Sequence, residues 1–455
     1  MLRYRCWPCL GLLLLAGGCS VPSPRDNAAA ASLVASKVPA PLAWRRDQQA
    51  DRAARERAAE LLAGGLTVEE AIGVAFLASP TLQLDFEQLE ISRAELVGAT
   101  RPANPVVVIG SREPGGELAP FYPDSTLSVG ILQNLISLLT IPDRRAQATH
   151  NLERVRYEVA QRASDHAARV AEGWYRYAAA QRLVGLHEQS VNVFRTALDN
   201  LAVMAANGEA EEADVAASRR DLHGFEANLD RVRMDAADER ANLEALLGIA
   251  GWRDDWQLAG ELPPLPGTDP DAAAIEAAAI TGRLDLQAGQ KAIEMRLRQL
   301  SSQRRFRWLN QLEIGVFREK ALGGTPFTGP TAAVELPLWD QRQEAVLAAD
   351  AELRGAMRQL EVAVIEARRQ IRSNSATVAT MRRLVQRYDR DVLPEHQRAA
   401  AALGAGNPGE LDRLNGRLAM LDAQREHIGL LRDYWVARSA LAQAGGDWLA
   451  LHGRP

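Results

Sequence analysis

The sequence predicts a mainly α protein with a small β part, built from one helix–β-hairpin–long coiled-coil unit that occurs twice. Three observations predict this fold class. Ala, Leu, Arg, Glu and Gln dominate the 455 residues and aromatic residues make up only 5%, a balance typical of long helices and coiled coils. Apolar residues recur in alternating steps of three and four over two long stretches, which is a heptad pattern. Landmark residues of the first half recur in the second half, which indicates an internal duplication.

The duplication rests on four landmark pairs, each 197 or 198 residues apart. We therefore expect two copies of one unit, at residues 66–250 and 269–450, with a linker at 251–268 and a C-terminal tail at 451–455. The landmarks are Asp143, Gly208, Asp214 and Gly248 in the first unit, and Asp340, Gly406, Asp412 and Gly446 in the second.

Each unit is expected to open with a helix. In the first unit Thr67 is followed three residues later by Glu70, which is the pattern of a capping box. In the second unit the sequence favours Asp269 as the N-cap, with Pro270 at the first helical position.

Two short strands are expected next in each unit, at about 105–112 and 125–134 and then at about 310–318 and 328–337. Ile314 and Val316 point one way while Glu313 and Gly315 point the other, which predicts an antiparallel sheet with one apolar face. One interpretation is a soluble four-stranded sheet packed on helices. The alternative is a membrane sheet, in which several chains must pool their strands because open edges are unsatisfied in lipid.

A very long helix is expected after the strands of each unit. In the second unit the stretch from Asp340 to about Leu403 contains no Gly or Pro except Gly355 and Pro394. Roughly 60 residues at 1.5 Å each give a rod of about 90 Å. The chain then returns through another helix, expected at Asp214–Leu247 in the first unit and at Glu410–Ala444 in the second. Such rods either bundle as a coiled coil or wall a tube.

The N-terminal stretch resembles a signal peptide that ends at a cysteine. A basic start precedes an apolar run that is too short to span a bilayer, and Gly18 then leads into Cys19, as in the bacterial lipoprotein box. In that interpretation residues 1–18 are removed, Cys19 is acylated, and residues 19–65 form a lipidated N-terminal extended segment. The alternative is an ordinary secretory signal with an incidental cysteine.

Several function classes are disfavoured by composition and motifs. The net charge of −5 is mild and well mixed, which argues against a nucleic-acid partner. The seven histidines are scattered, and no GxSxG, Walker or HExxH motif occurs. We therefore expect no enzyme, no cofactor and no metal site, and we expect each histidine to be a solvated helix residue.

The order of several short motifs resembles that of the TolC-like outer membrane efflux proteins. Leu66–Ala71 followed by Ser79–Leu82 is similar to the family's L-T-L-x-E-A…N-P-x-L opening, and Leu336–Asp340 resembles its L-P-L-F-D segment. The G-x5-D spacings that begin at Gly208 and at Gly406 resemble its signature at the two helix turns. The resemblance covers almost the whole chain after the N-terminal segment.

This resemblance implies a homotrimer. Its twelve-stranded β-barrel, with four strands from each chain, would lie in the outer membrane of a Gram-negative bacterium and continue as an α-helical barrel across the periplasm. The implied function is a passive duct that meets a periplasmic adaptor protein and, through it, an inner-membrane pump. Cys19 would tether each protomer to outer membrane lipid. The alternative function is a lipid-anchored periplasmic coiled-coil scaffold without channel activity. The cargo (drugs, metal ions or polypeptides) is not encoded in a readable motif.

The resemblance also implies site residues at the two helix turns. Asp412 matches the first acid of the family's D-x-x-D constriction, and Asn415 replaces the second. Three Asp412 carboxylates would form a ring that attracts cations, although an ordinary surface helix residue is the alternative. The residues assigned to helix reversal and adaptor contact are Gly208, Asp214, Gly404 and Gly406.

Overall fold

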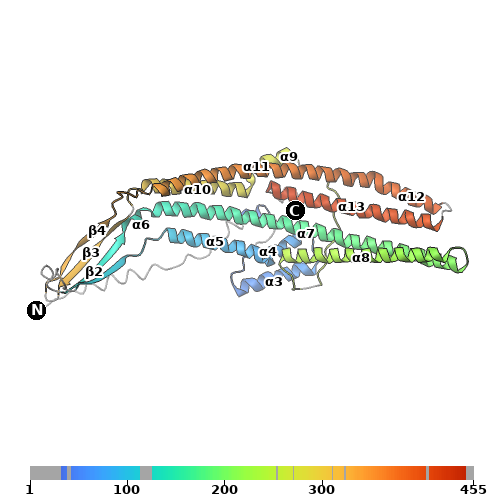
Figure 1. Cartoon of the computed structure of the whole chain (residues 1–455), viewed down its shortest axis with the longest axis horizontal. Coiled ribbons are helices and arrows are strands. Elements are labelled where there is room, and N and C mark those ends of the chain that lie inside the picture. The colour runs from blue at the N-terminus through green and yellow to red at the C-terminus, as the bar shows by residue number, and fades with distance from the viewer. Residues whose placement is uncertain are drawn as a thin grey trace.

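The chain forms an elongated molecule with a sheet at one end and two helix turns at the other (Figure 1). The computed structural model describes residues 32–37, 43–112, 125–252, 255–269, 271–309, 311–321, 324–405 and 409–446. The expected signal peptide, Cys19 and Gly406 lie outside these described residues.

The first unit contains helices α4, α5, α6, α7 and α8 and strands β1 and β2, and helix α3 precedes it. Their bounds are α3 Gln48–Ala63, α4 Val68–Ala78, α5 Pro80–Ala99, β1 Val106–Arg112, β2 Thr126–Asn134, α6 Leu135–Leu139, α7 Ile141–Ala206 and α8 Glu212–Leu247.

The second unit repeats this order without a counterpart of α6, and its long helix contains one turn of π-helix, η2. Its bounds are α9 Ala272–Gly282, α10 Leu284–Arg305, β3 Leu312–Ala321, β4 Phe327–Val334, α11 Gln343–Arg387, η2 Tyr388–Val392, α12 Leu393–Ala405 and α13 Glu410–Gly445.

The expected start of α4 is confirmed, whereas the expected start of α9 is wrong. Thr67 Oγ1 accepts the Glu70 N–H at 3.2 Å, and the Glu70 carboxylate accepts the Thr67 N–H at 2.9 Å. Helix α9 has Asp271 as its N-cap, which accepts the Ala274 N–H at 3.1 Å. Asp269 is drawn away from the helix end because it accepts hydrogen bonds from side chains of α11 and α13.

The four strands form one antiparallel sheet in the order β1-β2-β3-β4. The central pair joins the two units, and it sets Ile131 opposite Val316. The alternation expected for β3 is confirmed, since Ile314 and Val316 are exposed and Gly315 is half-buried. Strand β3 continues three residues beyond the expected end, to Ala321.

The long helices differ between the units. Helix α7 is continuous over 66 residues, which corresponds to about 100 Å. Its counterpart in the second unit is divided into α11 and α12 by the π-turn η2, where the Leu393 N–H donates to the Tyr388 carbonyl. Pro394 follows directly. Because proline has no N–H and its ring crowds the preceding turn, a wider turn at this place is a physical consequence of the sequence.

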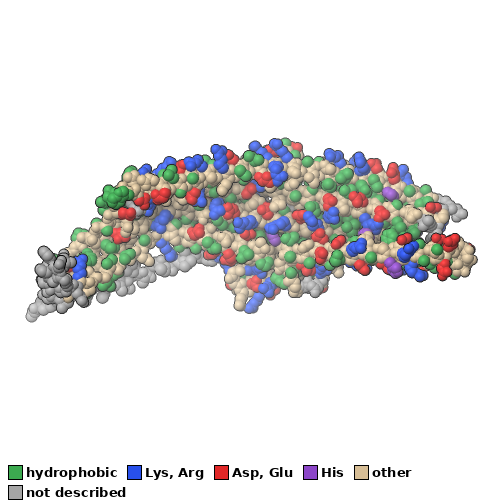
Figure 2. All heavy atoms as spheres, in the orientation of Figure 1, with side chains coloured by type: hydrophobic (Ala, Val, Ile, Leu, Met, Phe, Trp, Pro, Cys, Tyr) green, Lys and Arg blue, Asp and Glu red, His purple; other side chains and the backbone are tan. Residues whose placement is uncertain are grey.

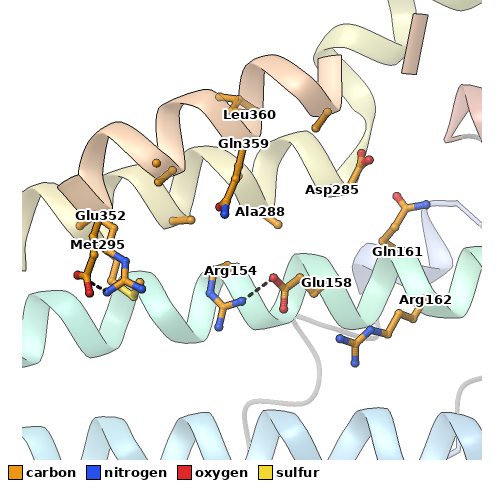
Figure 3. Close-up of a pocket in the computed structure, with 16 residues that line it drawn as sticks. Arg154, Glu158, Gln161, Arg162, Asp285, Ala288, Met295, Glu352, Gln359 and Leu360 are labelled. Carbon is orange, nitrogen blue, oxygen red and sulfur yellow. Dashed lines mark hydrogen bonds and ion pairs between the residues drawn. The ribbon is translucent and has the colours of Figure 1, made fainter. Parts of the chain in front are cut away.

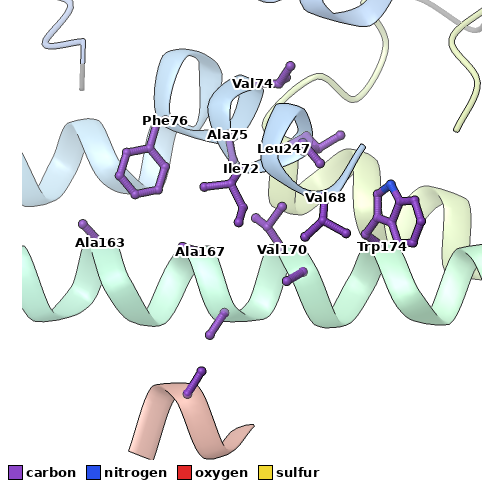
Figure 4. Close-up of a cluster of buried hydrophobic side chains, with 14 of the residues drawn as sticks. Val68, Ile72, Val74, Ala75, Phe76, Ala163, Ala167, Val170, Trp174 and Leu247 are labelled. Atoms are coloured by element: carbon purple, nitrogen blue, oxygen red, sulfur yellow. The ribbon is translucent and has the colours of Figure 1, made fainter. Parts of the chain in front are cut away.

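The largest hydrophobic core lies midway along the molecule, where α4 packs on α7. Val68, Ile72 and Phe76 of α4 face Ala163, Ala167, Val170 and Trp174 of α7 (Figure 4). Trp174 Nε1–H also donates to the Leu66 carbonyl at 2.7 Å. This core holds the sheet and the helix turns at fixed opposite ends.

Candidate functional site

The first helix turn is closed by Gly208. The Glu209 N–H donates to the Met204 carbonyl at 2.8 Å, and the Gly208 N–H donates to the Ala205 carbonyl at 3.0 Å. These two bonds form a Schellman motif, which requires the left-handed φ of +77° that Gly208 adopts. Gly208 therefore performs the helix reversal that the sequence assigned to it.

The first turn carries exposed carboxylates. Asp214 lies in the first turn of α8 with Glu212, and both are exposed beside Glu209 and Glu211. Red side chains gather at this end of the molecule in Figure 2. Negative charge is favourable at a helix N-terminus because of the helix dipole. Among the described residues no ion pair neutralises these four side chains, so the first tip is acidic.

Asp412 and Asn415 lie on the exposed surface of α13, near its start. Asp412 lies in the first turn, after the N-cap Gly409, and forms no ion pair with any described residue. Gly404 lies in the last turn of α12, one residue before its end. Asp412 and Asp214 thus occupy corresponding positions at the starts of α13 and α8.

Near the helix turns, helix α13 of the second unit packs on helices α7 and α8 of the first. Leu414 and Leu418 of α13 lie against the apolar cluster that α7 and α8 form from Val191, Phe194, Leu222 and Leu229. Farther along α13, the Arg425 guanidinium donates to Ser190 Oγ of α7 at 2.7 Å. The start of α13 is therefore positioned by contact with the first unit, and with it Asp412.

A groove of about 690 Å³ lies between α7, α10 and α11. The groove is open because small residues such as Ala288, Gly289 and Gly355 line part of it. Charged side chains line the rest (Figure 3). Arg154 pairs with Glu158 at 2.5 Å, and Arg296 pairs with Glu352 at 2.9 Å. Because these charges are paired with each other, the groove has no dominant sign.

One histidine cluster was missed by the sequence interpretation. His150 and Glu153 of α7 meet Glu294 of α10, with His150 Nδ1 at 2.9 Å from the Glu294 carboxylate. Lys291 Nζ lies at 3.1 Å from Glu153 and at 3.0 Å from Glu294. The Lys291 ammonium already pairs with both carboxylates, so we interpret the cluster as a clamp between the two units. The pair on α7 and the pair on α10 lie far apart in the chain, so local spacing could not show that they meet.

The expectation that every histidine is solvated is wrong for His166. Its side chain is 3% exposed, and Nε2–H donates to the Leu246 carbonyl at 3.0 Å. Burial, with a contribution from Arg169, lowers the pKa of His166 to about 4. His166 is thus a neutral residue that packs α7 against α8.

Among the described helices, none is long and apolar enough to cross a membrane. No protein-family model and no curated protein matches the chain.

Solved structures do match. A membrane protein from Pseudomonas aeruginosa has a TM-score of 0.69 at 16% identity, over 83% of this chain and 92% of its own. The outer membrane protein VceC from Vibrio cholerae has a TM-score of 0.67 at 15% identity, over 84% and 96%. The open state of the MtrE outer membrane channel from Neisseria gonorrhoeae has a TM-score of 0.67 at 14% identity, over 84% and 89%. This chain has the TolC-like outer membrane efflux channel fold.

The efflux channel fold accounts for the separation of the candidate residues. Gly208 and Asp214 lie at one turn, and Asp412 and Asn415 lie by the other turn at the same end of the molecule (Figure 1). The sheet lies at the opposite end, so the fold carries two separate surfaces rather than one enclosed site. In the described part of the chain, neither surface gathers the combination of nucleophile, acid and base that catalysis requires.

Proposed function

We propose that this protein is the outer membrane channel component of a tripartite export system. Three chains form a passive duct, in which the sheets close a twelve-stranded barrel and the long helices continue it across the periplasm. The tips meet a periplasmic adaptor protein, and an inner-membrane pump supplies the energy. Cys19 carries the acyl chains that tether each protomer to the outer membrane.

One observation carries this proposal. Most of the exposed apolar side chains of the sheet lie on the face that contains Ile109, Ile131 and Val316. The outer strands β1 and β4 are each paired on one side only within the described residues. In water, open edges and an uncovered apolar face favour aggregation; in lipid, open edges are untenable. If the sheet closes into a barrel with the sheets of two further chains, the backbone groups at the edges of β1 and β4 find hydrogen-bond partners. The apolar face then contacts lipid.

The tips support the second half of the proposal. Asp412 is exposed and unpaired among the described residues, so a three-fold axis near it would bring three carboxylates together. Such a ring attracts cations and narrows the duct electrostatically. Asn415 in place of a second acid predicts a single ring rather than two.

The experiment is planar-bilayer conductance of the purified, acylated protein, with its mass measured by light scattering. We expect a trimer that conducts, and we expect Asp412→Ala to raise the conductance and to reduce cation preference. Asn415→Ala is the matched control and should change the ion preference little. A non-conducting monomer or dimer would instead leave a lipid-anchored periplasmic scaffold.

A further inference from the structure

The strand register divides the sheet side chains into two faces. We call one the outward face; it contains Val107, Ile109, Ser111, Leu127, Val129, Ile131, Gln133, Leu312, Ile314, Val316, Arg318, Lys320, Thr328, Pro330, Ala332 and Val334. In β2 and β3 most members of this face are more exposed than the residues next to them in the strand. Leu127, Val129 and Ile131 are exposed, whereas Ser128 is half-buried and Gly130 is buried. The outward face is thus the open side of the sheet.

Two cations interrupt this largely apolar face at one end. Arg318 lies opposite Val129 and Thr328, and Lys320 lies opposite Leu127. Both side chains are exposed, and neither forms an ion pair with any residue in the described part of the chain. At about 3.3 Å per residue, Lys320 lies about 7 Å beyond Arg318, toward the end of β3.

On the opposite face of the sheet, which we call the inward face, the charged residues at the same end form an ion pair. Arg112 lies 3.9 Å from Glu319, and Glu319 neighbours Lys320 in the chain but points to the opposite side of the sheet. A cation is therefore matched by an acid on the inward face, while Arg318 and Lys320 have apolar or hydroxyl neighbours.

The opposite end of the sheet carries exposed aromatic and apolar side chains. Trp308 precedes β3 and is 55% exposed, and Trp339 follows β4 and is 89% exposed. Tryptophan is enriched where hydrocarbon meets water. The sheet thus has tryptophans toward the helices, an apolar middle, and cations at the far end.

We propose that Arg318 and Lys320 bind the phosphates of an anionic glycolipid in the outer leaflet. This inference rests on the proposed function, because it requires the outward face to contact lipid. A cation near the bilayer midplane is costly, but near the interface the cost is small and phosphate becomes a partner. Both side chains are long enough to lay their stems on the apolar face while the charged groups reach the headgroups.

The test measures lipid selectivity of the full-length protein in phosphatidylcholine nanodiscs. The discs contain either a bisphosphorylated glycolipid or its dephosphorylated form, and the glycolipid that remains bound after detergent exchange is measured. We expect the wild type to prefer the phosphorylated form. Lys320→Gln should lower that preference about fivefold, and Arg318→Gln with Lys320→Gln should lower it on the order of thirtyfold.

Arg112→Gln is the matched control, because it removes a cation from the same end of the sheet on the inward face. Its lipid preference should equal that of the wild type. Equal preference in all four proteins would overturn the inference, as would a loss in Arg112→Gln as large as in Lys320→Gln. The single Lys320→Gln variant at the strand end keeps the test open if the double variant does not fold.

The failure of this inference is distinguishable from failure of the proposed function. Trimer mass and conductance are measured on the same samples. If the protein is a conducting trimer without phosphate preference, only the lipid inference fails. If the wild type neither forms a trimer nor conducts, the proposed function fails as well.

Discussion

Helices α4 and α9 open the two units and occupy corresponding places, yet they are held by different forces. In α4, nine of 11 residues are buried. Helix α3 packs on its outer side with Ala54, Ala58 and Leu62, and α7 lies beneath it. In α9 only Ala279 is buried, and the helix packs on α10, α11 and α13.

Charged residues replace the missing apolar contacts around α9. Asp269 accepts from Arg382 at 2.6 Å, from Arg438 at 2.7 Å and from the Tyr434 hydroxyl at 2.6 Å. Glu276 pairs with Arg372 at 3.0 Å. The opening helix of the duplicated unit is therefore held in two ways. Helix α4 is held by apolar burial because α3 covers it, whereas the more exposed α9 is held largely by ion pairs around it.

The largest expected effect comes from removing Asp269. Asp269→Ala leaves the Arg438 guanidinium, which is 8% exposed on its side chain, without its carboxylate. The loss should be about 3–5 kcal/mol in the free energy of unfolding. Denaturant unfolding measures it. Asp271→Ala is the control, since it removes only the α9 N-cap and should cost about 1 kcal/mol; equal losses would contradict the distinction between these two acids.

A matched isoleucine pair compares the apolar contribution of the two helices directly. Ile72 of α4 is 1% exposed, whereas Ile275 of α9 is only partly buried. Ile72→Ala should cost about 3–4 kcal/mol because it creates a cavity, and Ile275→Ala should cost about 1 kcal/mol. Equal losses in thermal or denaturant unfolding would show that burial does not distinguish the two helices.

Acid should weaken the first unit before the second. The folded pKa of His166 is about 4, below its ordinary value of 6.5. As the pH falls, His166 therefore binds a proton in the unfolded state before it does so in the folded state. The contribution of neutral His166 to the free energy of unfolding is complete above pH 6.5 and falls by about 3 kcal/mol toward pH 4.

Asp269 behaves differently with pH. Burial raises the pKa of Asp269, but the bonds from Arg382 and Tyr434 outweigh it and hold the pKa below the ordinary 3.8. Its contribution is complete above that value and is lost only at lower pH. Unfolding measured across pH 7 to 3 checks the order. His166→Asn should flatten the change between pH 6.5 and 4, and an unchanged slope would contradict the assignment.

The smallest effect is expected for Glu276→Gln at the exposed edge of α9. Its partner Arg372 is largely exposed, so water and salt screen the pair. We expect a small fall in melting temperature at low salt that disappears at high salt. A large, salt-independent fall would mean that this pair acts like the Asp269 cluster.

The sequence by itself determined what depends on neighbours a few residues apart. The Thr67–Glu70 capping box, the alternation of Ile314 and Val316, and the glycine turn at Gly208 were all predicted and are confirmed. Each follows from backbone geometry that is set within one turn or one strand. The prediction that each unit returns through a second helix also holds, because the apolar heptads exclude any other long element.

Only the tertiary structure decided which distant residues meet. The sequence could not tell whether Asp269 or Asp271 caps α9, since both precede a helical run. Asp269 instead accepts hydrogen bonds from Arg382 and Arg438, which are more than 100 residues away in the chain. Nor could it pair β2 with β3, bring His150 to Glu294, or bury α4 beneath α3. These contacts depend on how the two units pack on each other. Local periodicity specifies which face of each element is apolar, but not which partner covers it.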